Sequence, residues 1–536
     1  MTAAAIALAV FFAAPLAFAA AAFAAPGPRP PAARRALLVG AALALAAAAA
    51  ALTAALAGPA TLRPLGPDLA PLSLRLDAVS ATLLLVIGIV GAVVLVYSRA
   101  YLDGDARQGR FLGWMSLTLC AVGLLVAAGD LVTLALAWIA VSLSLDRLLL
   151  HNAERAGARR AARKKFIASR MSDAALIGAA ALIWSSFGAI DLATIGAQAR
   201  AAAEAGAVSS LAQWAAALIA LAAVLKSAQF PAHGWLTEAM EAPTPVSALL
   251  HAGVINAGGF LLIRFSDLLI GAPGVLAALV IIGGFTALFG GLAMLTQPAV
   301  KTGLAWSTIS QMGFMVLQCG LALFPLALLH IAAHSLYKAH AFLSSGGAVA
   351  RVAALRQPGP VAAPSLGAVG RAFGVAAAIY AAVAVAFALV VGLDDKSPQA
   401  LALGAILIFG VAYLLAQGFA DAAPAALARR TALAAAAAAA AYLTLQTGAE
   451  ALYAGALPAA PRPGPLEWAL LVLALGSFGA VAIAQATLPL WAGHPAAAGL
   501  RVHLTNGLYV NALTDRLMGG WARPPAPEPA RPPAST

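Results

Sequence analysis

The sequence predicts an all-α polytopic membrane protein, and three observations support this fold class. Of the 536 residues, 62% are hydrophobic and only 10% are charged, whereas a soluble domain carries about 25% charged residues. The mean hydropathy is +0.92. Apolar runs of about 20 residues, each long enough to cross a bilayer once, recur along the whole chain.

We expect about fifteen transmembrane helices. The first apolar run could also be a secretory signal peptide, but it lacks the positively charged start of such signals, so we interpret it as the first span. The expected spans cover residues 3–25, 36–57, 79–98, 112–129, 131–149, 167–187, 208–228, 244–263, 274–295, 303–322, 324–345, 370–392, 399–418, 430–447 and 466–489.

Four regions follow from this pattern: N-terminal spans at 1–110, a core at 111–350, C-terminal spans at 351–490 and a tail at 491–536. The end of the tail is rich in Pro and Ala and cannot build a core, so we expect it to be disordered. The sequence predicts no soluble domain and no β-strands. No nucleotide, redox-cofactor or metal site is readable, so we expect no cofactor in this chain.

The loops predict an orientation. The strongest basic cluster lies at 151–166 and is expected to face the cytoplasm, where Lys and Arg collect. Alternation from there places the basic loops at 27–35, near Arg351 and near Arg430 on the same side, together with the tail. The acidic loop at 393–397 falls on the other side. The N-terminus is therefore expected outside and the C-terminus in the cytoplasm.

The net charge of +12 fits these cytoplasmic loops. A nucleic-acid surface is disfavoured because no basic stretch is interleaved with aromatic residues. The two cysteines, Cys120 and Cys319, lie inside apolar runs without metal-ligating neighbours, and we expect them to be packing residues.

Lys226 is the first ionisable group predicted at membrane depth. A charge at the bilayer centre costs about 3 kcal/mol or more, so such groups usually mark an ion or proton path. Pro231, Pro243 and Pro245 predict interrupted helices beside it, and interrupted helices line binding sites in transporters. The alternative is a lysine at a helix end whose charge reaches the interface.

A second set of groups follows in the chain. His330, His334 and Lys338 are spaced four apart, so they share one helical face. His titrates near neutral pH, which suits a proton relay, and His251 is a further candidate between the two lysines. Structural contacts between helices are the alternative, and a metal site is disfavoured because no third ligand is near.

Four acidic and basic residues complete the candidate site. Arg170 and Asp173 lie about one helical turn apart, close enough to pair, as a charge pair or as an interfacial ion pair. Glu238 and Glu241 lie on the cytoplasmic side between the broken helices, where they could form an entrance or a surface for a partner.

These residues carry a family resemblance. The segment "KSAQFPAHGWLTEAMEAPTPVSALLHAG" resembles the signature of the proton-translocating antiporter-like subunits of respiratory complex I and Mrp antiporters. The segments "FIASRMSDAALI", "VKTGLAWSTISQMGFMVL" and "HIAAHSLYKAHAFLSSGG" extend the resemblance over about 75–350. It implies two inverted five-helix repeats with broken helices, and a proton relay through Lys226, His330, His334 and Lys338.

The chain differs from the complex I subunits in two features, and these differences indicate a subfamily. Complex I subunits carry a glutamate after the Trp of the fifth span, whereas Ile139 follows Trp138 here. The nearest carboxylate is Asp146, about 10 Å along the helix. The chain also stops without the long lateral helix of the largest complex I subunit. These features resemble the DabB-type membrane subunit of bacterial inorganic-carbon transporters.

That resemblance implies an inner-membrane transporter subunit rather than an enzyme, with Arg170, Asp173 and Asp146 as charge partners of Lys226. It implies a soluble, zinc-containing, carbonic-anhydrase-like DabA partner and a flow of H+ or Na+. The family also implies a terminal lysine in the second repeat, but Lys396 falls in a loop. A respiratory or Mrp-type subunit and a non-conducting membrane anchor remain the alternatives.

Overall fold

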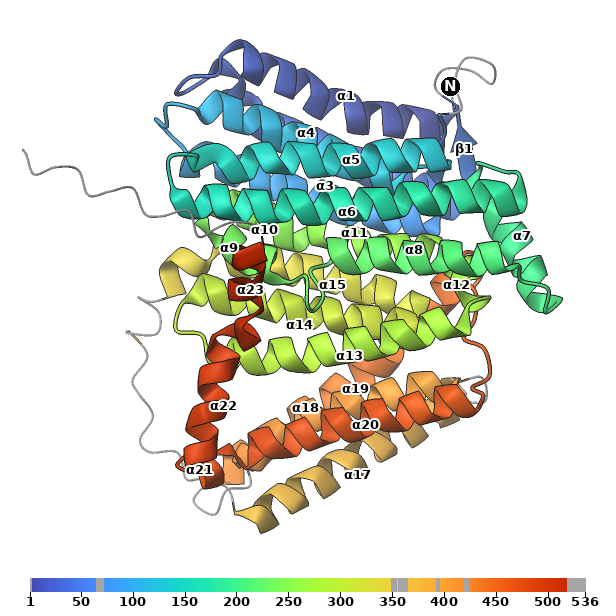
Figure 1. Ribbon diagram of the computed structural model, residues 1–536, viewed down its shortest axis with the longest axis vertical. Helices are drawn as coiled ribbons and strands as arrows, with labels where there is room; N and C mark the ends of the chain where they lie inside the picture. The colour runs from blue at the N-terminus through green and yellow to red at the C-terminus, as the bar shows by residue number, and fades with distance from the viewer. Residues whose placement is uncertain are drawn as a thin grey trace, which may run out of the picture.

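The computed structural model describes residues 2–63, 72–348, 354, 365–391, 396–418 and 425–517. Figure 1 shows a bundle of long helices that run side by side, with a short run of helices crossing one end of the bundle. The expected disordered end of the tail and the loops around Arg351 and Arg356 lie outside the described residues. The predicted all-α membrane fold is confirmed.

The first half of the chain supplies the upper layers of Figure 1. Its helices are α1 (Ala3–Ala24), α2 (Ala36–Ala57), α3 (Ala78–Tyr101), α4 (Gln108–Val126), α5 (Leu131–Leu149), α6 (Ala156–Phe187), α7 (Leu192–Glu204), α8 (Ser210–Lys226), α9 (Gly234–Glu238), α10 (Thr244–Ala252), α11 (Ala257–Arg264) and α12 (Ser266–Ile270).

The second half supplies the lower layers. Its helices are α13 (Pro273–Leu295), α14 (Val300–Gly320), α15 (Phe324–Leu343), α17 (Leu366–Val391), α18 (Pro398–Gly418), α19 (Ala425–Tyr453), α20 (Pro465–Ala486), α21 (Leu488–Trp491), α22 (Pro495–Thr505) and α23 (Val510–Leu517). The short 3-10 helices are η1 (Pro31–Arg35), η2 (Leu150–Asn152), η3 (Ala239–Glu241), η4 (Val254–Asn256), η5 (Ser345–Gly347) and η6 (Gly507–Tyr509).

Every predicted span falls on a helix, and the eighth span is divided into α10, η4 and α11. Within the described residues, eleven helices are long and apolar enough to cross a membrane, and α8 is a shorter apolar helix. The helices α14 and α15, which hold Lys301, Lys338 and three histidines, are 21 and 20 residues long but are too polar to be among the eleven.

Three features differ from the expectation. Strands β1 (Ala60–Leu62) and β2 (Leu74–Leu76) form a short antiparallel ribbon, although the sequence predicts no strands. They are only three residues long and carry no repeated apolar pattern, which explains why they were missed. The amphipathic helix α7 and the terminal helices α22 and α23 were also not expected, because none is long enough to cross a bilayer.

Helix α6 gives the most consequential difference. The sequence predicts a basic loop up to residue 166, but α6 begins at Ala156, so this segment is helical. Lys164 and Lys165 are buried rather than solvated. The physical reason is that carboxylates on neighbouring elements pair with both lysines, which offsets the cost of burial.

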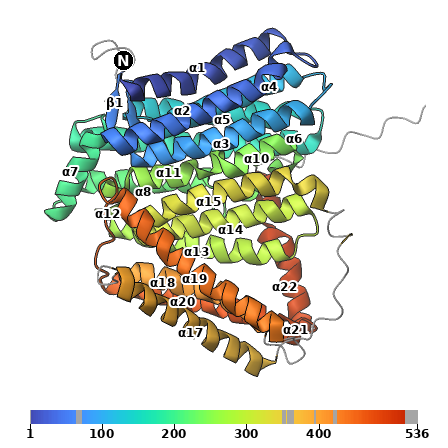
Figure 2. The same cartoon turned by 180° about the vertical axis from the view of Figure 1, so that it is seen from behind.

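The core is packed through small residues. Helices α13 and α14 contact each other closely because Gly283 and Gly290 of α13 face Gly313 and Ser310 of α14. A side chain at Gly283 would meet the backbone of α14, so only glycine allows this approach. Figure 2 shows α17, α18, α19 and α20 as a group beside α13. Buried residues of these four helices form a small apolar cluster of their own.

The two ends of the bundle differ in chemistry. At one end, the Gly109 N–H donates to the Gly27 carbonyl and His151 Nε2 lies 3.5 Å from Asp105 Oδ2. The basic loop at 27–35, the connection between α3 and α4, and the segment that follows α5 therefore meet at this end. The helices α22 and α23 cross the same end (Figures 1 and 2). This grouping agrees with the predicted alternation of loops.

The opposite end is held by ion pairs around Asp77, the N-cap of α3. Arg264 Nη1 lies 2.6 Å from Asp77 Oδ2, and Arg75 Nε lies 2.8 Å from the same oxygen. Burial acts to raise the pKa of Asp77, but Arg264 and Arg75 together hold this pKa well below its ordinary value. The carboxylate therefore stays charged and fixes β2 and α11 to α3.

Candidate functional site

Lys226 lies at a break between two helices. It is the last residue of α8, and helix resumes only at Gly234 in α9. Ala228 has a left-handed backbone with φ of 50°, and Pro231 has no N–H to donate. The predicted interruption beside Lys226 is thus present, and the lysine stands where the regular helix ends inside the bundle.

Among the described residues, the hydrogen-bond and ring contacts of the Lys226 ammonium are all with neutral groups. Its Nζ donates to Ser142 Oγ at 2.5 Å and to the Trp138 carbonyl oxygen at 3.3 Å. The same Nζ lies 4.5 Å from the centre of the Trp138 ring. Lys226 itself is 5% exposed. A buried lysine held by a hydroxyl, a carbonyl and an aromatic face can bind or lose a proton without breaking an ion pair.

Lys165 is a site residue that sequence reasoning missed. Its Nζ lies 2.9 Å from Asp146 Oδ1 and donates to the Ser142 carbonyl oxygen at 2.5 Å. Ser142 therefore binds both lysines through different oxygens. The sequence does contain a signal for these contacts. The spacing of Trp138, Ser142 and Asp146 places the three residues along one side of α5.

The predicted pair of Arg170 and Asp173 is present. Arg170 Nη2 lies 2.6 Å from Asp173 Oδ2 on α6. Both residues, together with Asp146 and Lys165, lie close enough to Lys226 to act on its charge electrostatically. The predicted charge partners of Lys226 are thus gathered on α5 and α6.

A second cluster lies on α10, α14 and α15. His251 Nδ1 is 2.9 Å from Thr308 Oγ1, and the His251 ring stacks on Phe342. Lys338 is fully buried and donates to the Leu304 carbonyl oxygen at 3.2 Å. His334 and Lys338 both lie within electrostatic reach of His251.

His330 lies at the edge of this second cluster. Its Nδ1 is 2.8 Å from Gln318 Oε1, and its ring centre is 6.0 Å from that of His334. The structure therefore brings His251, His330, His334 and Lys338 together. Within the described residues, no hydrogen bond or ion pair joins this cluster directly to Lys226.

Glu238 and Glu241 lie at the basic end of the bundle. Glu238 pairs with Lys164, and Arg160 Nε lies 3.5 Å from its other oxygen. Arg155 Nη1 lies 3.8 Å from Glu241 Oε2. Both glutamates thus lie beside the charged face of α6. They also lie between the broken helices, as the sequence predicts.

Helix α23 closes over this charged network. Lys164 Nζ lies 2.8 Å from Asp515 Oδ1, so one lysine joins Glu238 to the terminal helix. Asn511 Nδ2 donates to Thr237 Oγ1 at 3.2 Å. The part of the tail that precedes residue 518 is therefore docked on the core.

His233 and Lys396 both lie outside these clusters. His233 is buried among Phe230, Phe289 and Trp306, which supports a packing role. Lys396 lies just before α18, where it donates to Thr447 Oγ1 at 3.0 Å and pairs with Glu450. Its predicted placement in a loop is confirmed.

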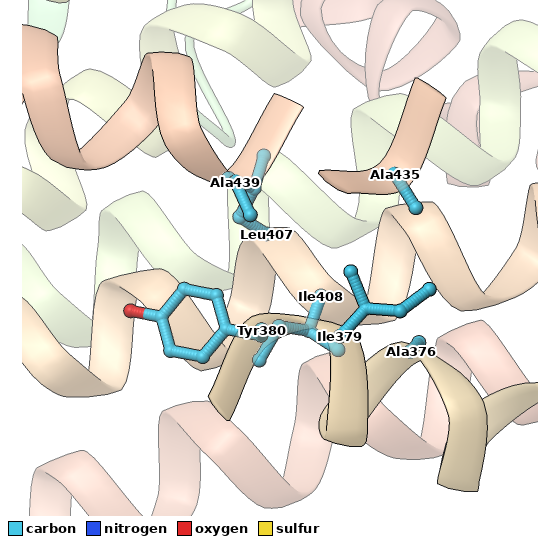
Figure 3. A pocket seen from close by; sticks show the side chains of 7 residues that line it. All are labelled: Ala376, Ile379, Tyr380, Leu407, Ile408, Ala435 and Ala439. Atoms are coloured by element: carbon cyan, nitrogen blue, oxygen red, sulfur yellow. The ribbon is translucent and has the colours of Figure 1, made fainter. Parts of the chain in front are cut away.

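The cavity between α17, α18 and α19 does not add to the site. It is lined by Ala376, Ile379, Tyr380, Leu407, Ile408, Ala435 and Ala439. Figure 3 shows the Tyr380 hydroxyl, the one side-chain oxygen among them, pointing away from the aliphatic side chains. The lining carries no charged group that could hold or pass an ion.

A multi-helix membrane bundle with clusters of buried lysines and histidines beside broken helices defines a class of ion-transporting membrane subunits. Residues 128–358 match the sequence profile of the family "NADH:quinone oxidoreductase/Mrp antiporter, TM". Residues 69–112 match that of "NADH-Ubiquinone oxidoreductase (complex I), chain 5 N-terminus". Over these two segments, the chain is similar to the antiporter-like membrane subunits of these complexes.

Two individual relatives show how similar the chain is to named proteins of this family. The chain is 47% identical over 283 residues to the "probable inorganic carbon transporter subunit DabB2" of Halothiobacillus neapolitanus, covering 53% of this chain and 51% of the relative. It is 38% identical over 279 residues to "NADH-quinone oxidoreductase subunit L" of Mycobacterium tuberculosis, covering 52% and 43%. The chain spans about half the length of the curated relatives it matches.

The fold comparison extends over nearly the whole chain. A chain of the Mrp complex from Dietzia sp. superposes with a TM-score of 0.62 at 26% identity, covering 97% of this chain and 60% of that one. The antiporter-like family predicted from the sequence is confirmed, and several curated relatives are named as inorganic-carbon transporter subunits.

Proposed function

We propose that this chain is the ion-translocating membrane subunit of an energy-coupled inorganic-carbon pump. In this proposal, H+ or Na+ flows through the bundle and drives carbon uptake by a soluble, zinc-containing, DabA-like partner. Inorganic carbon is proposed as the transported species because three relatives are named as probable inorganic carbon transporter subunits. The chain itself acts as a transporter subunit of the bacterial inner membrane, and the catalytic chemistry belongs to the partner.

The contact set of Lys226 is the observation that carries the proposal. A serine hydroxyl can accept a hydrogen bond from an ammonium and can donate one to a neutral amine. Ser142 can therefore satisfy Lys226 in both protonation states. A buried group that is satisfied in both states is suited to load a proton and release it.

The charges around Lys226 control how strongly this lysine holds its proton. An opposite charge within about 4–6 Å favours the charged form of a group, and a like charge disfavours it. Arg170, Asp173 and Asp146 act on Lys226 with both signs. A rearrangement of the Arg170–Asp173 pair would change how strongly Lys226 holds its proton.

His251 then serves as the next step toward Lys338, with His334 and His330 completing the relay. Glu238 and Glu241 form the entrance or the surface that meets the partner, since they lie at the same end of the bundle as α23. Imidazole and amine groups at neighbouring positions can pass a proton by successive transfer.

The test is carbon-dependent growth and labelled inorganic-carbon uptake in a strain that relies on this chain and its partner. We expect Lys226→Gln and Lys338→Gln each to abolish growth at air levels of CO2, and we expect an uncoupler to abolish uptake. Arg200→Gln, which removes a charge outside both clusters, should retain growth. Normal growth of both lysine variants would overturn the relay.

The uncoupler also separates the alternatives. Uptake that an uncoupler leaves intact would indicate a non-conducting membrane anchor. Co-purification of the chain with a zinc-containing soluble protein would support the carbon pump, whereas co-purification with dehydrogenase or antiporter subunits would indicate a respiratory or Mrp-type complex.

A further inference from the structure

A groove of about 820 Å³ lies on the side of the bundle that α1, α4, α5 and α6 form. These four helices lie side by side in Figure 1. Most of the groove wall is apolar, and it includes Leu16 of α1, Leu117 of α4, Leu143 of α5 and Phe166 of α6. Leu143 and Phe166 are exposed, so the groove opens at the outer surface of the bundle, where the bilayer surrounds the protein.

The length of the groove matches one leaflet of a bilayer. Along α4 it extends from Trp114 to Leu124, which corresponds to about 15 Å. The hydrocarbon core is about 30 Å thick, so one leaflet contributes about 15 Å. Trp114 lies about 9 Å from the start of α4, and α4 starts at the basic end of the bundle. The groove therefore lies in the leaflet next to the basic end.

Two charged residues belong to the groove wall. Asp146 pairs with Lys165 of α6, so its charge is compensated. Arg147 is exposed, and no carboxylate among the described residues pairs with it. Its guanidinium carbon lies 5.8 Å from the centre of the Trp114 ring, a distance at which the aromatic face attracts the cation. A positive charge without an anionic partner is thus held at the rim of an apolar groove.

Arg163 adds a second positive charge at the same end. It precedes Phe166 by one turn on the same face of α6, which places it about 4.5 Å closer to the basic end. Arg163 is exposed, and within the described ranges no ion pair neutralises it. The planar fork of a guanidinium matches the oxygens of a phosphate group. The apolar wall is thus followed at its basic end by two arginines on neighbouring helices.

We propose that this groove binds an anionic phospholipid, with its phosphate at Arg147 and Arg163 and one acyl chain along the apolar wall. Anionic lipids enrich the cytoplasmic leaflet, and basic pockets between transmembrane helices on that side bind their headgroups. A transmembrane helix of a partner protein would contact the bundle over about 30 Å, which is twice the length of the groove. The proposal does not depend on ion translocation through the bundle.

Headgroup selectivity is the first test. The purified full-length chain receives equal amounts of phosphatidylglycerol and phosphatidylcholine with identical acyl chains, and native mass spectrometry counts the retained lipids. We expect about tenfold more phosphatidylglycerol than phosphatidylcholine, because two arginines favour its net negative charge. Arg147→Gln/Arg163→Gln should abolish this preference, whereas Arg501→Gln, which removes an exposed arginine of α22, should keep it. Equal retention of both lipids by the unaltered protein, or an unchanged preference in the double variant, would overturn the proposal.

The apolar wall has a test of its own. Leu143→Trp fills the groove, whereas Leu136→Trp enlarges an exposed leucine two turns away on α5 that does not line it. We expect Leu143→Trp to retain about threefold less phosphatidylglycerol at equal headgroup charge, since the acyl chain loses its wall, and Leu136→Trp to behave like the unaltered protein. Equal retention by the two variants would place the acyl chain elsewhere.

The third test identifies the occupant of the groove in the membrane. A phosphatidylglycerol with a diazirine on its acyl chain is activated in native membranes that contain the chain and its partners. Peptides that contain Leu117 or Leu143 should be labelled, and Arg147→Gln/Arg163→Gln should lower this labelling about tenfold. Absence of label from both peptides would mean that a protein covers the groove, and the lipid site would be refuted.

Discussion

Ser142 is the residue on which both lysines of the first cluster depend. Its hydroxyl accepts from Lys226, and its carbonyl oxygen accepts from Lys165. Ser144, two residues further on α5, uses its hydroxyl only for carbonyls of its own helix. The two serines thus have the same chemistry on the same helix but opposite relations to the site.

Ser142→Ala should slow transport while Ser144→Ala should not. A hydrogen bond to a charged group contributes about 1.5–3 kcal/mol, which corresponds to roughly a 10- to 100-fold change in rate. We expect the initial rate of labelled inorganic-carbon uptake to fall within this range for Ser142→Ala. Equal rates for the two alanine variants would show that the Lys226–Ser142 contact has no role in transport.

Single residues also show what the sequence could and could not reveal. Lys226, His251 and Lys338 stand out because charge is rare in apolar runs. Lys165 could not be recognised from the sequence because it follows several surface arginines and has the same charge as they do. Only the three-dimensional pairing of α6 with Asp146 distinguishes a buried lysine from a solvated one.

At the scale of elements, α23 connects the end of the chain to the candidate site. The helix is held by Asp515 to Lys164 and by Asn511 to Thr237. Lys164 retains Glu238 as a partner when Asp515 is removed. The contact can therefore be weakened without leaving Lys164 as a buried charge without a partner.

Asp515→Asn should loosen α23 without unfolding the bundle. A partly exposed ion pair contributes up to about 1 kcal/mol, so we expect about a fivefold increase in amide hydrogen exchange over 510–517. Thr514→Ala removes a hydroxyl that bonds only to Val510 of the same helix, and it should exchange like the unaltered protein. Unchanged exchange in Asp515→Asn would mean that this pair does not hold α23.

The contact between α13 and α14 depends on glycine. Gly283→Val would place a side chain against the backbone of Leu317 and Gly313. Overpacking of this kind costs about 1–3 kcal/mol, so the melting temperature of the purified protein should fall by several degrees. Gly284→Val is the matched control, since a Cβ there meets one side-chain atom at ordinary contact distance. A similar decrease for both variants would contradict close packing at Gly283.

At the scale of the whole molecule, the spans were predictable and their connections were not. Apolar runs locate each long helix because the bilayer fixes both length and composition. The start of α6, the ribbon of β1 and β2, and the docking of α23 depend on contacts between segments far apart in the chain. Periodicity within one segment carries no information about such contacts.

The arrangement of the ends leads to a final prediction, the orientation of the molecule. The basic loops and α23 share one end, whereas α7 lies at the other (Figure 1). The positive-inside tendency places the basic end in the cytoplasm. The native thiols of Cys120 and Cys319 are buried, so a new exposed cysteine can report the side on which it lies.

Arg159→Cys and Ala205→Cys place single exposed thiols at the two ends. A membrane-impermeant maleimide should label Arg159→Cys in inverted vesicles and Ala205→Cys in intact spheroplasts, each at least tenfold above the unaltered protein. The reversed pattern would place the basic end outside. The entrance at Glu238 and the Asp146–Lys165 pair would then face the outer compartment, and the direction of ion flow through Lys226 would be opposite.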